Sequence, residues 1–194
     1  MVPDYCLIAE IMMYSQGILK ASTLARKLVN VFKMCSEQLS SQCHYDFGMR
    51  AVKSVLHLCG MMKTKNPNMD EEELLYQAMR KIMCPKLVNN DSCLFENIMR
   101  DLFPTMKASP TCNPEMNEHV KRAFERNNLH PTPYMVEKVF EMEETTQVRH
   151  GFMLIGETKR GKTCIQQVYC EAMESCHEKK KIHRHIINPK SMNC

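Results

Sequence analysis

The chain has 194 residues, of which 44% are hydrophobic and 25% are charged, and its formal net charge is +4 at pH 7. These proportions are typical of a globular protein with a packed core, and so small a charge does not indicate a nucleic-acid partner. No apolar run approaches the roughly 20 residues of a membrane-spanning helix, and no basic and apolar leader begins the sequence, so neither a membrane partner nor a signal peptide is expected.

Two amphipathic helices are predicted at the start of the chain. Asp4 is suited to cap the first helix, and Gly17 is suited to end it. The second helix follows directly and is broken by the polar sequence SSQCH. The expected buried positions are Leu7, Ile8, Ile11 and Met12 in the first helix, and Leu24, Leu28, Val31, Phe32 and Cys35 in the second.

A third helix is predicted to open at Asp46 and to end at the sequence KNPN. Its apolar and polar residues separate onto opposite sides when they are placed at helical spacing. The inward positions are Ala51, Val55, Leu58 and Met62, and the outward positions are Arg50, Lys53 and His57.

Two further helices complete the first hundred residues. Asp70 precedes an acidic first turn at residues 71–73, which the helix dipole favours, and Pro85 ends this fourth helix. Asp91 is predicted to cap a fifth helix that ends before Pro104. Because all five helices are amphipathic, we expect them to pack together as a small helical bundle.

The organisation changes after residue 105. The sequence TMKASPTCNP has no periodicity and predicts a linker, which we place at residues 106–113. Two helices are expected at about 114–128 and 132–148. The apolar run GFMLIG then predicts a buried strand, residues from about 161 to 177 predict a helix, and KIHRHIIN predicts a second strand. This order is typical of the opening of an α/β nucleotide-binding sheet.

The eleven cysteines are not spaced as metal ligands. No C-x-x-C pair occurs, and neither Cys176-His177 nor the His183/His185 pair has a second pair of ligands at zinc-finger distance. An odd number of scattered cysteines without a secretory signal is typical of reduced, mostly buried thiols in the cytosol. We therefore expect no zinc site.

The sequence GETKRGKT matches the phosphate-loop pattern G-x-x-x-x-G-K-[ST] at every fixed position. Its glycines allow a sharp turn that brings backbone N–H groups close to phosphate oxygens. Lys162 supplies a cation for the β- and γ-phosphates, and the Thr163 hydroxyl is suited to ligate Mg²⁺. The predicted nucleotide-binding residues are Gly156, Glu157, Thr158, Lys159, Arg160, Gly161, Lys162, Thr163 and Cys164.

Hydrolysis of a nucleotide needs acidic residues at the end of a later strand, which hold Mg²⁺ and orient water. No such strand follows Thr163, and Glu171, Glu174 and Glu178 lie at helical spacing typical of a solvated face. We therefore expect ATP or ADP binding at most. Two other functions remain open: a helical interaction module with an inert loop, and a small stand-alone P-loop ATPase or kinase.

Five stretches resemble a dynein heavy chain, in the order of that family and over nearly the whole chain. They are VPDYCLIAEIMMYSQGI, KLVNVFKMCSEQLSSQCHYDFGMRAVKSVL, LFENIMRDLFP, VRHGFMLIGETKRGKT and INPK. The resemblance implies that residues 1–105 are the end of the first AAA+ module with its helical small subdomain. It also implies that residues 114–194 are the start of the second module, an incomplete P-loop α/β large subdomain with a Walker A loop at Gly156–Thr163. The expected fold is mainly α with a small α/β part.

The resemblance carries one further residue and a cellular setting. Arg50 aligns with the sensor-2 arginine, which reaches toward the nucleotide of the preceding module. The parent would be an ATP-driven microtubule motor, with other AAA+ modules, intermediate and light chains and microtubules as partners. Its expected location is the cytoplasmic cytoskeleton, with the ciliary axoneme favoured because axonemal types outnumber cytoplasmic ones.

Several parts of the family's pattern do not occur in this sequence. The Walker B acidic pair, the first sensor and the arginine finger are absent, and so are the stalk and the microtubule-binding tip. We therefore expect a fragment of a motor that binds nucleotide without hydrolysing it.

Overall fold

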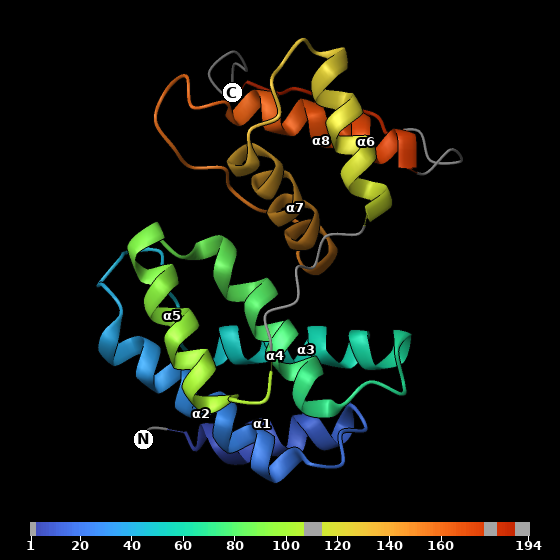
Figure 1. The fold of residues 1–194 in the computed structure, drawn as a ribbon. Helices are drawn as coiled ribbons and strands as arrows, with labels where there is room; N and C mark the ends of the chain where they lie inside the picture. Colours follow the sequence, from blue (N-terminus) through green and yellow to red (C-terminus); the bar gives the residue numbers. More distant parts are fainter. Residues whose placement is uncertain (1–2, 107–113, 177–181, 189–194) are drawn as a thin grey trace, which may run out of the picture. The chain divides into compact units, whose positions relative to one another are not determined.

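The computed structural model describes residues 3–106, 114–176 and 182–188, and within these ranges the secondary structure is entirely helical. The helices are α1 (Tyr5–Ser15), α2 (Ala21–Gln38), α3 (Met49–Lys65), α4 (Glu71–Met83), the 3₁₀ helix η1 (Cys84–Lys86), α5 (Asn89–Leu102), α6 (Pro114–Arg126), α7 (Pro133–Val148) and α8 (Lys162–Cys176) (Figure 1). None of the described helices has the length and apolar character needed to cross a bilayer.

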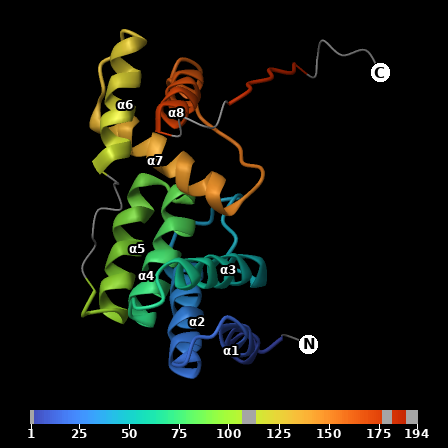
Figure 2. The ribbon, with the colours of Figure 1, turned by 90° about the vertical axis from the view of Figure 1, so that its right-hand side faces the viewer.

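The chain divides into two compact units. Unit 1 holds α1 to α5 together with residues 144–150, and unit 2 holds α6, the greater part of α7, and α8. In unit 1, α1 packs on α2 and α3, α3 packs on α4, and α2 packs on α5 (Figure 2). The helical bundle expected for the first hundred residues is thus present. The predicted linker at 106–113 lies outside the described residues, apart from Met106, whose N–H bonds to the Phe103 carbonyl over 3.1 Å.

The predicted stripe of α2 forms the centre of the unit 1 core. Leu28 and Cys35 are fully buried, and the remaining members of the stripe are no more than 4% exposed. On α3, three of the four predicted inward residues, Ala51, Val55 and Leu58, are buried, and the fourth, Met62, is half-buried. The predicted outward residues, Arg50 among them, are exposed. Helical periodicity was therefore a sufficient guide wherever one side of a helix is polar.

The prediction for α1 was partly wrong. Asp4 caps the helix as expected, because its Oδ1 accepts hydrogen bonds from the N–H groups of Cys6 and Leu7. The buried residues, however, are Ala9 and Met13. Leu7 is 55% exposed and Ile11 is 59% exposed. This helix is apolar on most of its circumference, so its pattern does not select one face.

Two predicted helix starts also needed correction. Helix α3 begins at Met49 rather than Asp46, whose Oδ1 instead accepts a hydrogen bond from the N–H of Gly48 over 3.0 Å. Asp91 does not cap α5, because the helix begins at Asn89 and Asp91 is its third residue. Asp46 thus accepts a hydrogen bond within its own loop, Asp91 accepts hydrogen bonds from residues distant in the sequence, and neither caps a helix.

Asp91 instead holds the loop between α2 and α3. It is only 5% exposed, and its Oδ2 accepts hydrogen bonds from the hydroxyls of Ser40 (2.5 Å) and Tyr45 (2.7 Å). The Tyr45 oxygen in turn accepts a bond from the N–H of Val88 (2.9 Å). The bonds from Ser40 and Tyr45 lower the pKa of Asp91, so the buried group remains a carboxylate.

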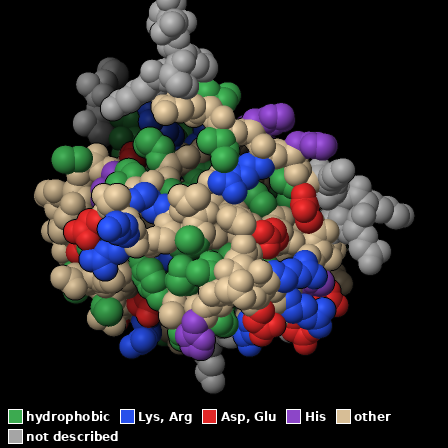
Figure 3. All heavy atoms as spheres, turned by 90° about the horizontal axis from the view of Figure 1, so that it is seen from above, with side chains coloured by type: hydrophobic (Ala, Val, Ile, Leu, Met, Phe, Trp, Pro, Cys, Tyr) green, Lys and Arg blue, Asp and Glu red, His purple; other side chains and the backbone are tan. Residues whose placement is uncertain are grey.

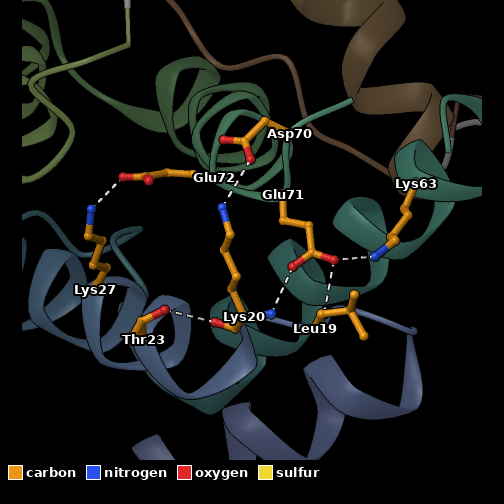
Figure 4. Close-up of polar contacts among 8 residues, drawn as sticks. All are labelled: Leu19, Lys20, Thr23, Lys27, Lys63, Asp70, Glu71 and Glu72. Atoms are coloured by element: carbon orange, nitrogen blue, oxygen red, sulfur yellow. Dashed lines mark hydrogen bonds and ion pairs between the residues drawn. The ribbon is translucent and has the colours of Figure 1, made fainter. Parts of the chain in front are cut away.

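The Glu71 carboxylate, at the start of α4, joins this helix to α3 and to the loop before α2 in unit 1 (Figure 4). Its oxygens accept hydrogen bonds from the N–H groups of Leu19 (2.9 Å) and Lys20 (2.8 Å), just before α2. It also pairs with the ammonium group of Lys63 on α3, which donates to the Gly17 carbonyl over 2.5 Å. The side chain of Glu71 is only 12% exposed, so this charge is largely removed from water and depends on these partners.

Unit 2 is built on the packing of α6 against α8, with α7 contributing to the same core. Its buried residues are Met116, Val120, Ala123, Phe124, Val139, Met142, Ile165, Val168 and Ala172. Asn127 adds polar contacts after α6: its Nδ2 donates to Glu171 over 2.7 Å, and its Oδ1 accepts from Gln167 over 2.7 Å. The described bounds of α6, α7 and α8 agree closely with the predicted ones.

The two predicted strands are absent from the described residues. Residues 151–157 and 182–188 are irregular, with Met153 at 83%, Ile155 at 82% and Ile186 at 79% exposure. Figure 3 draws one face of the molecule, on which hydrophobic side chains lie among charged ones. A parallel strand needs backbone partners and cover on both faces, which two short segments do not supply to each other. The α/β part of the expected fold is therefore not formed here.

The cysteines are less buried than expected. Among the nine in the described residues, only Cys35 and Cys59 are buried, whereas Cys43 and Cys93 are exposed. Burial raises the pKa of Cys35 to about 12 and that of Cys59 to about 11. These two thiols are consequently inert structural residues.

Replacing Glu71 by alanine is expected to destabilise unit 1 by about 2–3 kcal/mol, because two backbone N–H groups and an ammonium group lose a charged partner. Asp70→Ala is the matched control, since Asp70 forms only a solvent-exposed pair with Lys20 and no capping bond. It should cost at most about 1 kcal/mol. Urea unfolding followed by circular dichroism measures both, and equal effects would contradict the role given to Glu71.

The Glu71 contribution should also depend on pH. Burial would raise the pKa of Glu71, but the bonds from Lys20, Lys63 and Leu19 outweigh it and the pKa is lowered. The carboxylate therefore stabilises the folded state above the unfolded pKa of about 4.3, and this contribution is lost as the pH falls through the folded pKa.

We expect the difference in unfolding free energy between wild type and Glu71→Gln to be largest near about pH 7 and to shrink below about pH 4.3. Urea unfolding of the two proteins across this range gives the difference directly. A difference that stays constant with pH would show that the charge of Glu71 contributes nothing.

Candidate functional site

The G-x-x-x-x-G-K-T sequence lies at a sharp bend directly before α8. Two residues within it have left-handed backbone conformations, Lys159 with φ 66° and Gly161 with φ 82°. The helix begins at Lys162, and the N–H of Ile165 donates to the Gly161 carbonyl over 2.9 Å. Alternation of left- and right-handed residues turns successive backbone N–H groups toward one side, which is the arrangement that binds anions.

The start of α8 adds a second favourable feature. The helix has 15 residues and no acidic side chain in its first turn. Its N-terminal N–H groups and its dipole therefore present positive potential without a carboxylate to offset it. Thr163 is exposed at the second position of α8, and Cys164 beside it is half-buried.

The Lys162 side chain bonds back to the start of the loop. Its ammonium group donates hydrogen bonds to the carbonyl oxygens of Gly156 and Glu157, each over 2.7 Å. These bonds link the first residue of α8 to the beginning of the loop. The cation expected to meet phosphate is thus already directed into the bend.

An ion pair spans the outer part of the same loop. The guanidinium of Arg160 donates from Nε (3.0 Å) and from a terminal nitrogen (2.8 Å) to one oxygen of Glu157. Both side chains are more than 70% exposed, so the pair contributes at most about 1 kcal/mol to stability. Since Lys159 and Lys162 accompany Arg160, the loop carries three cations and one carboxylate.

The nine predicted nucleotide-binding residues are consecutive in the sequence and lie in unit 2. Arg50, the predicted sensor, is an exposed residue at the start of α3 in unit 1. Glu171 and Glu174, predicted as a solvated face, have structural contacts: Glu171 binds Asn127, and Glu174 accepts from the N–H of Ile182 over 3.1 Å. Glu178 lies outside the described residues.

One residue near the loop was not indicated by the sequence. A Cβ atom built on Gly161 would lie 3.0 Å from the ε-methyl group of Met135, which is in α7. No sequence signal distinguishes this methionine from the other members of a chain that contains 18 of them. Among the described residues, no group of three or more histidine, cysteine or acidic side chains is placed to hold a metal ion.

The comparisons with known proteins agree on one family. A family model described as "Hydrolytic ATP binding site of dynein motor region" matches residues 1–163. The chain is 43% identical to dynein axonemal heavy chain 1 of Rattus norvegicus and 40% identical to dynein axonemal heavy chain 6 of Homo sapiens, in each case over 99% of its own length. It is 42% identical to dynein axonemal heavy chain 12 of Rattus norvegicus over the same share. It spans only 4–6% of the length of these relatives.

Gly161→Ala is expected to destabilise the chain by about 1–2 kcal/mol, because a left-handed backbone brings a Cβ too close to the following carbonyl oxygen. Gly151→Ala is the matched control, since a Cβ there would meet nothing within 4 Å. It should be neutral or stabilising by up to about 1 kcal/mol. Thermal unfolding compares the two, and equal stability would contradict the left-handed turn at Gly161.

Proposed function

The chain belongs to the dynein heavy chain family, and we propose that it supplies an ATP-binding segment to a dynein motor. The observation that carries this proposal is the left-handed turn at Gly161 immediately before α8, with the Lys162 ammonium group directed into the same bend. The loop sequence and the local geometry agree, and the family match includes all eight residues of Gly156–Thr163.

Nucleotide binding would exchange the hydrogen bonds of Lys162. In the structure the ammonium group donates to two neutral carbonyl oxygens. A β- or γ-phosphate oxygen is charged, and charge-assisted hydrogen bonds are roughly twice as strong as neutral ones. Backbone N–H groups of the bend and the N-terminus of α8 would bind the remaining phosphate oxygens. Phosphate therefore competes favourably with the internal acceptors of the loop.

Mg²⁺ would accompany the nucleotide. The exposed hydroxyl of Thr163 is one oxygen ligand, and phosphate oxygens and water are the partners that this ion usually retains. Bound Mg²⁺ supplies neutralisation of phosphate charge, while the chain itself contributes the hydroxyl, the ammonium group and the backbone donors.

In the intact motor we assign residues 1–105 to the end of one AAA+ module, 106–113 to a linker and 114–194 to the start of the next. Arg50 would act as the sensor-2 residue for the earlier module, as the resemblance to dynein heavy chains implies. Its exposed position on the polar side of α3 is compatible with that role. ATP or ADP would act by shifting rigid subdomains of the ring. The other modules, intermediate and light chains and microtubules are the proposed partners, and the ciliary axoneme is the proposed location.

A second candidate function is a helical interaction module with an inert loop. The apolar side chains of α1 favour it, since Leu7, Ile11 and Tyr14 repeat at helical spacing and each is more than 50% exposed. Exposed apolar patches often mark protein interfaces. This candidate and nucleotide binding make opposite predictions for Lys162.

Lys162→Gln is expected to weaken binding of a fluorescent ATP analogue with Mg²⁺ by about 2 kcal/mol, roughly 30-fold, because a charged hydrogen-bond donor to phosphate is lost. Lys159→Gln removes the same charge from an exposed position of the same loop and should weaken binding by at most about fivefold. Fluorescence anisotropy titration measures both affinities.

Equal binding by wild type and Lys162→Gln would support the inert loop. Equal losses in the two variants would show that only net charge attracts the nucleotide. Steady ATP turnover that disappears in Lys162→Gln would instead favour a small stand-alone ATPase.

A further inference from the structure

The contact between α7 and the bend before α8 links the core of unit 2 to the phosphate loop. The ε-methyl group of Met135 is the one atom that a Cβ at Gly161 would meet within 4 Å among the described residues, chain neighbours aside. Every residue from 151 to 160 is exposed. Gly161 is half-buried, so it is the first residue after this exposed segment that is partly covered by unit 2.

Met135 is itself well anchored. Its side chain packs against the unit 2 core, which contains Val139 of α7 and Ile165 of α8. Its backbone N–H donates to the Thr132 hydroxyl over 3.3 Å, and the N–H of Val136 donates to the Thr132 carbonyl over 3.1 Å. These two hydrogen bonds hold the first turn of α7, which carries Met135, in place.

We propose that Met135 is a positioning residue for the phosphate loop: its side chain reaches from α7 to Gly161 and holds the left-handed turn in place before a nucleotide arrives. The expected effect of Met135 on nucleotide affinity rests on the proposed function. A turn that is already held in place loses less conformational entropy when the nucleotide binds. The contact itself exists without a ligand and is testable without one.

Glycine and methionine suit this contact for separate reasons. Gly161 leaves room for a close approach and accepts φ 82° without a Cβ penalty. A thioether side chain is unbranched and makes no hydrogen-bond demand, so it fills the space above the backbone without competing for the N–H groups that phosphate would use. Leucine, of similar volume, should replace it with little loss.

The test uses the complete 194-residue chain and limited digestion with trypsin. Cleavage after Lys159 or Arg160 reports on the loop, and cleavage after Arg122 in α6 reports on opening of unit 2 as a whole. The ratio of these rates separates local loosening from general instability. We expect Met135→Ala to raise this ratio roughly threefold or more, and Met135→Leu to restore it.

Met142→Ala is the matched control. Met142 lies on the same helix and in the same core, 6% exposed, about two helical turns farther from the loop. It should lower the stability of unit 2 at least as much as Met135→Ala while leaving the cleavage ratio near that of the wild type. An equal rise in the ratio for both alanine variants would overturn the proposal, because Met135 would then be only a core residue.

Nucleotide affinity provides the second readout. Met135→Ala should weaken binding of the fluorescent ATP analogue, and Met135→Leu should recover it. Unchanged affinity together with an unchanged cleavage ratio would overturn the proposal. If the wild-type chain binds no nucleotide, the proposed function fails, but the cleavage ratio still decides whether Met135 holds the loop.

Discussion

Burial of an apolar helix side against its neighbours is the interaction on which both units depend. Unit 1 closes around the stripe of α2, and unit 2 closes where α6 and α7 pack on α8. Hydrophobic burial is not directional, so it gathers the helices without fixing how their ends meet. In unit 1 that specificity comes from two nearly buried carboxylates. Glu71 fixes the start of α2 against α3 and α4, and Asp91 fixes the loop before α3 against α5.

The sequence predicted those features that depend on neighbours along the chain. The burial of Leu28 and Cys35 on α2 follows from a helix with one polar side. The cap at Asp4 and the start of α8 at Lys162 depend on residues only a few positions apart. The bend of the phosphate loop belongs to the same class, because two glycines and the following helix define it locally.

Features that depend on distant partners could not be predicted in the same way. The residues next to Asp91 in the sequence do not show that Tyr45 will bond to it. The prediction, which used only neighbouring residues, therefore assigned Asp91 to a helix N-cap. The exposed side of α1 and the contact of Met135 with Gly161 likewise depend on which helix packs where. The strand at GFMLIG has the right composition, but a strand forms only when other segments satisfy its backbone groups. Composition alone does not reveal whether those segments are available.

The two carbonyl partners of Lys162 bear on how a nucleotide would leave the proposed site. If the site binds a polyphosphate as proposed, the Lys162 ammonium group would donate to the carbonyl oxygens of Gly156 and Glu157 when that ligand leaves, as it does in the structure. The ammonium group would then keep hydrogen-bond partners, whose loss would cost free energy. Under the proposed function, exchange of one nucleotide for another would thus need a change in the Lys162 side chain, while the turn at Gly161 keeps its left-handed conformation.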